Sequence, residues 1–220
     1  MSASSDPRLI YVADPMCSWC WGFAPAIADI RAAFQDRIPV HLVMGGLRPG
    51  TSQPMDARSK TETRSHWDHV HEASGQPFDF GFFDRDGFVY DTEPAARAVV
   101  VLRRAGHDLA MAGLMRIQRA FYAENRDVTR AEVLTELVAE LGVDAGQFRD
   151  AFDAETARDE TLDDFALARA FGVTGFPTLI AARGADGPFA IATRGFCPAA
   201  PLIPALGTWF GVPAEAAATP

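Results

Sequence analysis

Short apolar runs and helical spacings of apolar residues alternate at the start of this chain. Apolar runs cover residues 8–13 and 38–44, which predicts two strands. Between them, apolar residues recur at spacings of three and four from Phe23 to Phe34, which predicts a helix over residues 17–35. A strand, a helix and a strand of these lengths are typical of a βαβ unit with parallel strands.

The middle of the chain has a different pattern. Amphipathic helical spacing dominates there, and runs of β-branched residues are rare. Thr129 and Glu132 have the spacing of a capping box, which predicts the start of one helix. The predicted helices cover residues 57–73, 92–105, 107–124, 129–141 and 144–153. This part of the chain is therefore expected to form a helical insertion.

Strand patterns return towards the C-terminus. The expected elements are a helix over 158–171, a strand over 173–182, a hairpin turn at 184–188, a strand over 189–193 and a helix over 199–210. The Ala- and Pro-rich tail from Pro213 is expected to be frayed. Strands and helices that alternate in this way predict an α/β fold.

Composition and charge narrow the possible functions. The chain has 220 residues, 48% hydrophobic and 22% charged, as in an ordinary globular protein. A net charge of −9 argues against nucleic acid as a partner. No run reaches the ~18 apolar residues that span a bilayer, and residues 1–8 lack an apolar signal region. We therefore expect a cytoplasmic protein without a membrane partner; its oligomeric state is not predicted.

The most informative chemical signal is the pair Cys17 and Cys20, which follows the first predicted strand and begins the first predicted helix. Two intervening residues in a helical turn let the sulfurs form a disulfide with little backbone movement. The N-terminus of a helix also stabilises the thiolate of the first cysteine, which is its reactive form. In the cytoplasm such a pair is more often catalytic than structural. The pair therefore predicts dithiol redox chemistry.

Other interpretations of the cysteines and histidines stay open at this point. The pair Cys17 and Cys20 fits half of a zinc site or a purely structural contact, but zinc requires four ligands and the only further cysteine is Cys197. Cys197 fits a third redox thiol, a site of glutathione attachment or a small buried residue. His66, His69 and His71 are interpreted as exposed helix surface, and we expect no metal.

Three local motifs, in this order of elements, carry a family resemblance. They are Cys17-Ser18-Trp19-Cys20, Pro25 five residues later, and Gly175-Phe176-Pro177-Thr178 before a late strand. The chain resembles the DsbA-like branch of the thioredoxin superfamily, and especially its cytoplasmic, FrnE-like disulfide oxidoreductases or isomerases. The resemblance covers nearly the whole chain. It implies a thioredoxin-like domain of residues 1–52 and 158–220 with a large α-helical insertion, residues 53–157.

The resemblance also implies roles for individual residues. Cys17 is expected to be the nucleophile and Cys20 the resolving thiol, with a cis Pro177 facing the sulfurs. The backbone at Phe176 is expected to pair with an extended substrate. Exchange is expected to pass through a mixed disulfide on Cys17. The residues expected to contact substrate are Trp19, Phe176, Thr178 and Gly195.

The expected partners are thiols or disulfides, either of proteins or of glutathione as a co-substrate, and no cofactor is expected besides the redox-active disulfide. The leading alternative is a glutathione-dependent isomerase or transferase, of the 2-hydroxychromene-2-carboxylate isomerase or kappa-class type. Those relatives carry a serine in place of Cys17 and lack the second cysteine. A non-catalytic binding or chaperone module is the other alternative.

Three neighbouring features complete the predicted site. Asp14 is interpreted as a loop cap rather than a proton acceptor. The helix over residues 57–73 is expected to overhang the cysteines and to help bind substrate. The Phe-rich segment at residues 78–83 is expected to seal the helical insertion onto the rest of the protein.

Overall fold

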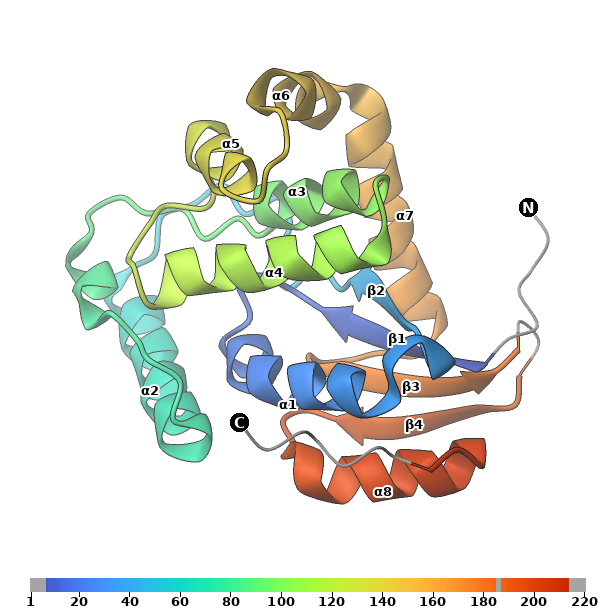
Figure 1. Cartoon of the computed structure of the whole chain (residues 1–220). Coiled ribbons are helices and arrows are strands. Elements are labelled where there is room, and N and C mark those ends of the chain that lie inside the picture. The colour runs from blue at the N-terminus through green and yellow to red at the C-terminus, as the bar shows by residue number, and fades with distance from the viewer. Residues whose placement is uncertain (1–6, 185–186, 214–220) are drawn as a thin grey trace.

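A four-stranded mixed sheet lies at the centre of the computed structural model, which describes residues 7–184 and 187–213 (Figure 1). Its strands are β1 (Pro7–Ala13), β2 (Val40–Met44), β3 (Thr178–Arg183) and β4 (Phe189–Arg194). The strand order is β2-β1-β3-β4; β1 and β2 are parallel, and β3 is antiparallel to both β1 and β4. The predicted parallel pair and C-terminal hairpin are confirmed.

All the predicted helices are present, with ends that shift by a few residues. They are α1 (Ser18–Phe34), α2 (Ala57–Ser74), α3 (Glu93–Arg103), α4 (His107–Tyr122), α5 (Ala131–Ala139), α6 (Ala145–Asp153), α7 (Glu155–Ala170) and α8 (Ala199–Phe210). Two short 3-10 helices, η1 (Gln35–Arg37) and η2 (Phe80–Asp84), follow α1 and α2.

Helices cover both faces of the sheet. Along β1, Leu9 and Tyr11 belong to the main core with α1 and α8, whereas Ile10 and Val12 belong to a smaller core with α7. This alternation is the two-residue periodicity of a strand that is buried on both faces. The apolar run that predicted β1 therefore reflects burial on both sides.

Helices α2 to α6 lie between β2 and α7 in the chain; α3 to α6 group together above β2, whereas α2 lies apart from them, beside α1 (Figure 1). Within this insertion, Trp67 of α2 packs on Phe82 and Phe83 of η2 and on Phe121 of α4. These side chains are buried and belong to the same core as β1 and α1. The Phe-rich segment therefore joins α2 to the main core, as expected.

Asp164 of α7 joins three elements at the β2 edge. Its Oδ2 accepts a hydrogen bond from Met44 N at 2.8 Å and from Arg103 Nη1 at 2.6 Å, and its Oδ1 accepts from Arg103 Nη2 at 2.9 Å. Arg103 comes from α3 and also donates to Leu42 O of β2. This two-pronged ion pair, which is largely buried, fixes α3 and α7 to the end of β2.

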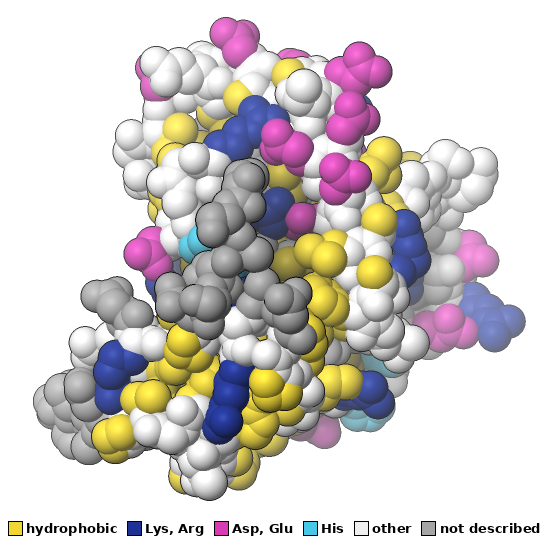
Figure 2. All heavy atoms as spheres, turned by 90° about the vertical axis from the view of Figure 1, so that its right-hand side faces the viewer, with side chains coloured by type: hydrophobic (Ala, Val, Ile, Leu, Met, Phe, Trp, Pro, Cys, Tyr) yellow, Lys and Arg dark blue, Asp and Glu magenta, His cyan; other side chains and the backbone are white. Residues whose placement is uncertain are grey.

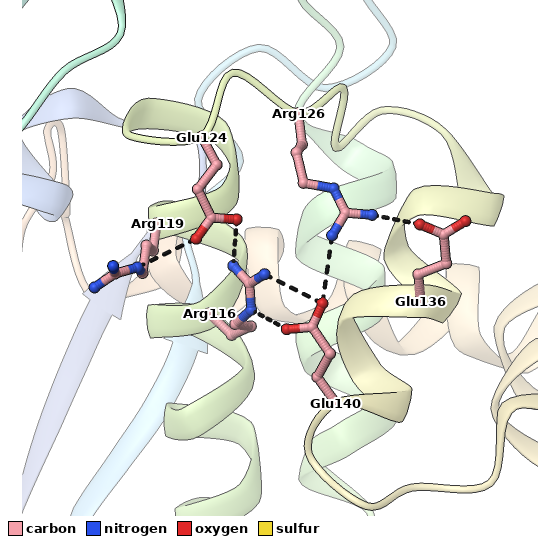
Figure 3. A network of polar contacts seen from close by, with 6 residues as sticks. All are labelled: Arg116, Arg119, Glu124, Arg126, Glu136 and Glu140. Atoms are coloured by element: carbon pink, nitrogen blue, oxygen red, sulfur yellow. Dashed lines mark hydrogen bonds and ion pairs between the residues drawn. The ribbon is translucent and has the colours of Figure 1, made fainter.

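Charged residues on the surface join α4 to α5 (Figure 3). Arg116 of α4 pairs with Glu140, just after α5, at 2.5 Å and with Glu124 at 2.9 Å. Arg126 also pairs with Glu140, and with Glu136 of α5. Because hydrogen bonds to Glu140 and Glu124 favour its charged form, the pKa of Arg116 is raised.

Two local predictions are wrong. The strand predicted over 173–182 begins only at Thr178, directly after Pro177, which has no N–H to donate to a ladder. The predicted capping box is absent, because Thr129 donates both its N–H and its hydroxyl to Asp127 Oδ1 and α5 begins at Ala131. The predicted hairpin turn includes residues 185–186, and the predicted frayed tail includes 214–220; these lie outside the described residues.

Candidate active site

Cys17 and Cys20 lie where the chain leaves β1 and enters α1. Cys17 is the N-cap of α1, and its carbonyl accepts hydrogen bonds from Cys20 N at 3.0 Å and Trp21 N at 3.1 Å. The exposed fraction is 6% for Cys17 and 0% for Cys20, and both are free thiols. Burial raises the pKa of the Cys20 thiol, and its hydrogen bond with Cys17 raises it further. Cys17 is therefore the more accessible of the two sulfurs.

The segment before β3 faces Cys17. The Cys17 thiol donates to Phe176 O at 3.6 Å, and the Phe176–Pro177 peptide bond is cis. Gly195 N donates to Pro177 O at 2.7 Å, which ties this segment to the end of β4. The Phe176 ring rests on Gly45, where an added Cβ would lie 2.1 Å from ring atom Cε1. Only glycine at this position leaves room for the ring.

A pocket of about 210 Å³ opens beside Cys17. It lies between the start of α1, the loop after β2, helix α2 and the segment before β3, and we call it the Cys17 pocket. Its lining residues are Met16, Cys17, Ser18, Trp19, Leu47, Arg48, Thr63, His66, Trp67, Tyr90 and Phe176. The pocket gives an external sulfur a route to Cys17.

Helix α2 forms one wall of this pocket and is fastened to α1 through Trp21. The Trp21 indole Nε1 donates to Pro77 O at 3.0 Å, and Gln76 Nε2 donates to Trp21 O at 3.0 Å. The Trp21 ring also stacks on Tyr122 of α4. Trp21 is therefore structural, whereas Trp19, which was expected to contact substrate, lines the pocket and lies against Phe196.

Asp14 lies buried at the end of β1 and acts as the predicted loop cap. Its Oδ1 accepts from Met16 N at 2.8 Å, and its Oδ2 accepts from Leu47 N at 2.7 Å. Burial raises its pKa to about 6, although these backbone N–H groups oppose the shift. Its charge acts on the buried Cys20 thiol. Asp14 is therefore a capping residue that can also exchange a proton near neutral pH.

Tyr11, two residues before the end of β1, is another buried polar group near the cysteines. Burial raises its pKa, and so do the charges of Cys20 and Cys17 and a hydrogen bond with Cys20. The Tyr11 ring packs on Phe23 of α1. The deeper sulfur thus has a hydroxyl as a neighbour in an otherwise apolar core.

The other predicted residues are arranged as follows. Thr178 is buried and donates its hydroxyl to Gly175 O at 2.8 Å, and neither Thr178 nor Gly195 lines the Cys17 pocket. Cys197 is half-buried outside the pocket lining. Of the three histidines of α2, His66 lines the pocket and His71 Nδ1 lies 2.8 Å from Gln76 O. Within residues 7–184 and 187–213, no cluster of three or more potential metal ligands occurs.

The sequence interpretation missed Arg48, Thr63 and Tyr90. Tyr90 donates its hydroxyl to Met16 O at 2.7 Å, and the Arg48 guanidinium lies 5.0 Å from the Tyr90 ring centroid. A signal for Arg48 was available, because parallel strands place the loops at their carboxyl ends side by side. Because β1 ends beside Cys17, the parallel strand β2 also ends there, and the loop that carries Arg48 begins at that edge. Thr63 and Tyr90 carry no comparable signal.

Comparison with known families identifies this architecture. The model of the DSBA-like thioredoxin domain matches residues 8–194. The chain belongs to the DSBA-like thioredoxin domain family. The predicted DsbA-like resemblance and the predicted thioredoxin-like fold with a helical insertion are confirmed. The coarser functional expectation, a family of thiol-disulfide oxidoreductases, is supported at the same time.

Two solved structures are similar to this chain over nearly its full length. A "putative protein disulfide isomerase" from Nitrosomonas europaea is 36% identical with a TM-score of 0.87, covering 94% of this chain and 98% of that one. The cytosolic disulfide reductase DsbM from Pseudomonas aeruginosa, solved with GSH, is 32% identical with a TM-score of 0.74, covering 93% and 100%.

A more distant relative has a different kind of role. The ClpXP adapter protein SpxH of Bacillus subtilis (strain 168) is 22% identical over 175 residues, which are 79% of this chain and 58% of the adapter. The match thus spans little more than half of that protein.

The described residues of this DSBA-like chain contain no helix whose length and hydropathy would let it cross a bilayer.

Proposed function

We propose that this DSBA-like protein is a thiol-disulfide oxidoreductase that works through Cys17 and Cys20. The observation that carries the proposal is the unequal exposure of the two sulfurs. Cys17 lines a pocket and lies against Phe176 O, whereas Cys20 is wholly buried one helical turn deeper. An external disulfide therefore has access to Cys17 alone, and Cys20 is held in place to resolve the product.

The exchange runs in two balanced steps. The Cys17 thiolate attacks one sulfur of a substrate disulfide, forms a mixed disulfide and releases the other sulfur as a thiolate. The Cys20 thiolate then attacks the Cys17 sulfur, forms the Cys17–Cys20 disulfide and releases the second substrate thiolate. Two electrons pass from the dithiol to the substrate. The reverse steps oxidise a substrate dithiol, and the partner with the higher potential sets the direction.

Asp14 and Tyr11 serve the second step. Burial raises the pKa of Cys20, so this thiol must lose its proton before it attacks. We propose that Asp14, whose pKa is raised to about 6, takes up that proton. The hydrogen bond between Tyr11 and Cys20 orients the sulfur within the core. Asp14 is thus both the loop cap and the proton acceptor in this proposal.

Phe176, Pro177 and Trp19 supply the substrate contacts in this proposal. The Phe176 carbonyl already accepts from the Cys17 thiol, and we propose that the backbone at Phe176 pairs with an extended peptide substrate. Glutathione is the proposed small-molecule partner, since DsbM was solved with GSH and is 32% identical. DsbM is a cytosolic disulfide reductase, which also supports a cytoplasmic site of action for this chain. Isomerase activity would use the same two sulfurs.

Non-catalytic protein binding is the second candidate function. It is favoured by the match to an adapter protein and by exposed large hydrophobic residues, which include Leu162 and Leu167 of α7 and Phe189 and Ile191 of β4. Hydrophobic side chains also gather on the face of the molecule that Figure 2 shows. This function does not require either sulfur. A Cys17→Ser variant would retain it in full.

Variants in which one cysteine at a time is replaced by serine test the proposal. With glutathione disulfide, Cys20→Ser should accumulate a mixed disulfide on Cys17, visible by intact mass, because the resolving thiol is gone. Cys17→Ser should form none and lose at least a thousandfold in exchange rate. Cys197→Ser, which removes a cysteine outside the pocket, is the matched control and should behave as the wild type. Equal reactivity of all three variants would exclude the proposed redox pair.

A further inference from the structure

The Cys17 pocket has polar side chains that the disulfide chemistry does not use. Thr63 and Trp67, both on α2, line the pocket and have exposed fractions of 6% and 0%. The Thr63 hydroxyl and the Trp67 indole N–H have no hydrogen-bond partner among the residues described. An unpaired buried polar group is destabilising, so a hydrogen-bond partner from outside the chain is favoured. Thr63 and Trp67 thus bring two unpaired hydrogen-bonding groups to the wall of one pocket.

Arg48 brings a cation to the same pocket. Its backbone is fixed, because its N–H donates to Thr92 Oγ1 at 3.1 Å and its carbonyl accepts from Thr51 Oγ1 at 3.0 Å. Its guanidinium lies against the Tyr90 ring, 5.0 Å from the centroid. The described part of the chain offers it no carboxylate partner within 4 Å. Arg48 is therefore a positioned cation with its ion-pairing capacity free.

The charge of the pocket is opposite to that of the protein. The chain carries a net charge of −9, yet no Asp or Glu lines the pocket, whose ionisable groups besides the Cys17 thiol are Arg48, His66 and the Tyr90 phenol. Two acids near the pocket already have backbone partners: the Asp14 oxygens accept from Leu47 N and Met16 N, and Asp91 Oδ1 accepts from Gly50 N. An anion therefore finds attraction and hydrogen-bond donors in this pocket, and a cation finds no partner.

We infer that the Cys17 pocket is a recognition site for a small disulfide that carries a carboxylate near its sulfur. Arg48 would bind the carboxylate, and Thr63 and Trp67 would bind polar atoms of the same ligand. The volume of about 210 Å³ suits a moiety of amino-acid or dipeptide size rather than a folded segment. This inference rests on the proposed exchange at Cys17 and adds a substrate class and three specificity-determining residues to it.

Single-turnover reduction of two disulfides tests the role of Arg48. Glutathione disulfide carries carboxylates, and bis(2-hydroxyethyl) disulfide carries none. For Arg48→Gln we expect about a tenfold loss of kcat/KM with glutathione disulfide, mostly in KM, and less than a twofold loss with the neutral disulfide. Arg58→Gln is the matched control, because Arg58 lies on exposed α2 surface outside the pocket. Raised salt should reduce the preference of the wild type.

A variant at Thr63 separates recognition from structure. Thr63→Val removes only the unpaired hydroxyl, so it should raise the melting temperature. The same variant should weaken binding of S-methylglutathione, which cannot form a disulfide, by about fivefold in calorimetry. A purely structural hydroxyl would lower stability on removal and leave binding unchanged.

Three results would overturn the inference. One is an equal loss of rate on both disulfides in Arg48→Gln, and another is no loss on either. The third is equal rates for glutathione disulfide and for an acetylated, amidated cystine peptide without acidic groups, which would assign the pocket to peptides. Failure of the wild type to reduce any of these disulfides would instead contradict the proposed function itself.

Discussion

Asp14 and Asp164 are two buried carboxylates that hold the end of β2 and the loop after it, yet their charges are balanced differently. Asp164 accepts from Met44 N and forms a two-pronged ion pair with Arg103. Asp14 accepts from Leu47 N, three residues further on, and has no cationic partner among the residues described. Burial therefore raises the pKa of Asp14 to about 6. The comparison separates a charge that fixes the fold from one that remains able to exchange a proton beside the thiols.

Arg103→Met removes the cation that pairs with Asp164 and should have the largest effect on the free energy of unfolding. It leaves the Asp164 carboxylate buried without its cation, which typically costs 3–5 kcal/mol, on the order of a third of a domain's stability. We expect the free energy of unfolding, measured with urea, to fall by roughly 3 kcal/mol or more. Arg104→Met is the control, since Arg104 pairs with Glu160 at the surface and should change stability by less than about 1 kcal/mol. Similar losses in the two variants would show that the Asp164 pair is not special.

Asp14→Asn tests the carboxylate that has no cationic partner, through the pH dependence of protein stability. Because the pKa of Asp14 is about 6 in the fold and near 4 when unfolded, the folded state binds the proton more tightly. Ionisation of Asp14 therefore destabilises the protein, with no penalty below about pH 4 and the full penalty above about pH 6. We expect wild-type stability to fall relative to Asp14→Asn by about 2–3 kcal/mol across that window.

The measurement is urea unfolding of both proteins at steps of pH from 4 to 7. The difference between them removes the contribution of every other group, and the lost Leu47 hydrogen bond adds only a constant. A difference that stays flat with pH would contradict the raised pKa of Asp14. A difference of opposite slope would indicate a cation near Asp14.

His41→Gln should show the opposite pH slope and a smaller effect. His41 of β2 stacks on His107 of α4, and burial together with the charges of His107 and Arg8 lowers the pKa of His41 to about 4. Protonation of His41 therefore destabilises the fold as the pH falls from about 6.5 to 4, and stability is fully kept above that window. We expect the variant to lose about 1 kcal/mol less than the wild type on acidification, since the ring is half-buried. An unchanged acid slope would contradict this.

Arg116→Met should have the smallest effect. Arg116 is the centre of the network in Figure 3, where it pairs with Glu140 and Glu124 at the surface. Ion pairs of this kind contribute about 1 kcal/mol or less, and salt screens them. We expect the free energy of unfolding to fall by about 1 kcal/mol or less in low salt and by less than that in 1 M salt. A salt-independent loss would point to packing of the arginine stem instead.

Much of the fold could be predicted because its signals are local. The Cys17 and Cys20 spacing, the strand before it and the helix after it are neighbours in the chain, so local pattern and chemistry agree. The start of β3 and the absent capping box were missed for a related reason. Pro177 has no N–H to donate to a ladder, so β3 begins only after it, and Thr129 donates to Asp127 instead of capping α5. A single residue or a competing local acceptor thus overrides the wider pattern in both places.

The pocket was less predictable than the sulfurs. Arg48, Thr63 and Tyr90 reach Cys17 from three separate segments, and their meeting depends on how the insertion folds back over α1. Their residue types carry no signal by themselves, since most arginines and threonines are surface residues. The proton-exchanging character of Asp14 also depends on the absence of a nearby cation, which only the three-dimensional arrangement provides.

The redox equilibrium of Cys17 and Cys20 against glutathione tests the central claim most directly. The Cys197→Ser protein should be used, so that the pair is the only dithiol, and the state of the sulfurs should be read by intact mass and by the fluorescence of Trp19 and Trp21. We predict one reversible two-electron transition to an internal disulfide, at a potential within about −270 to −120 mV. A protein that forms no reversible Cys17–Cys20 disulfide under any glutathione ratio would contradict the account.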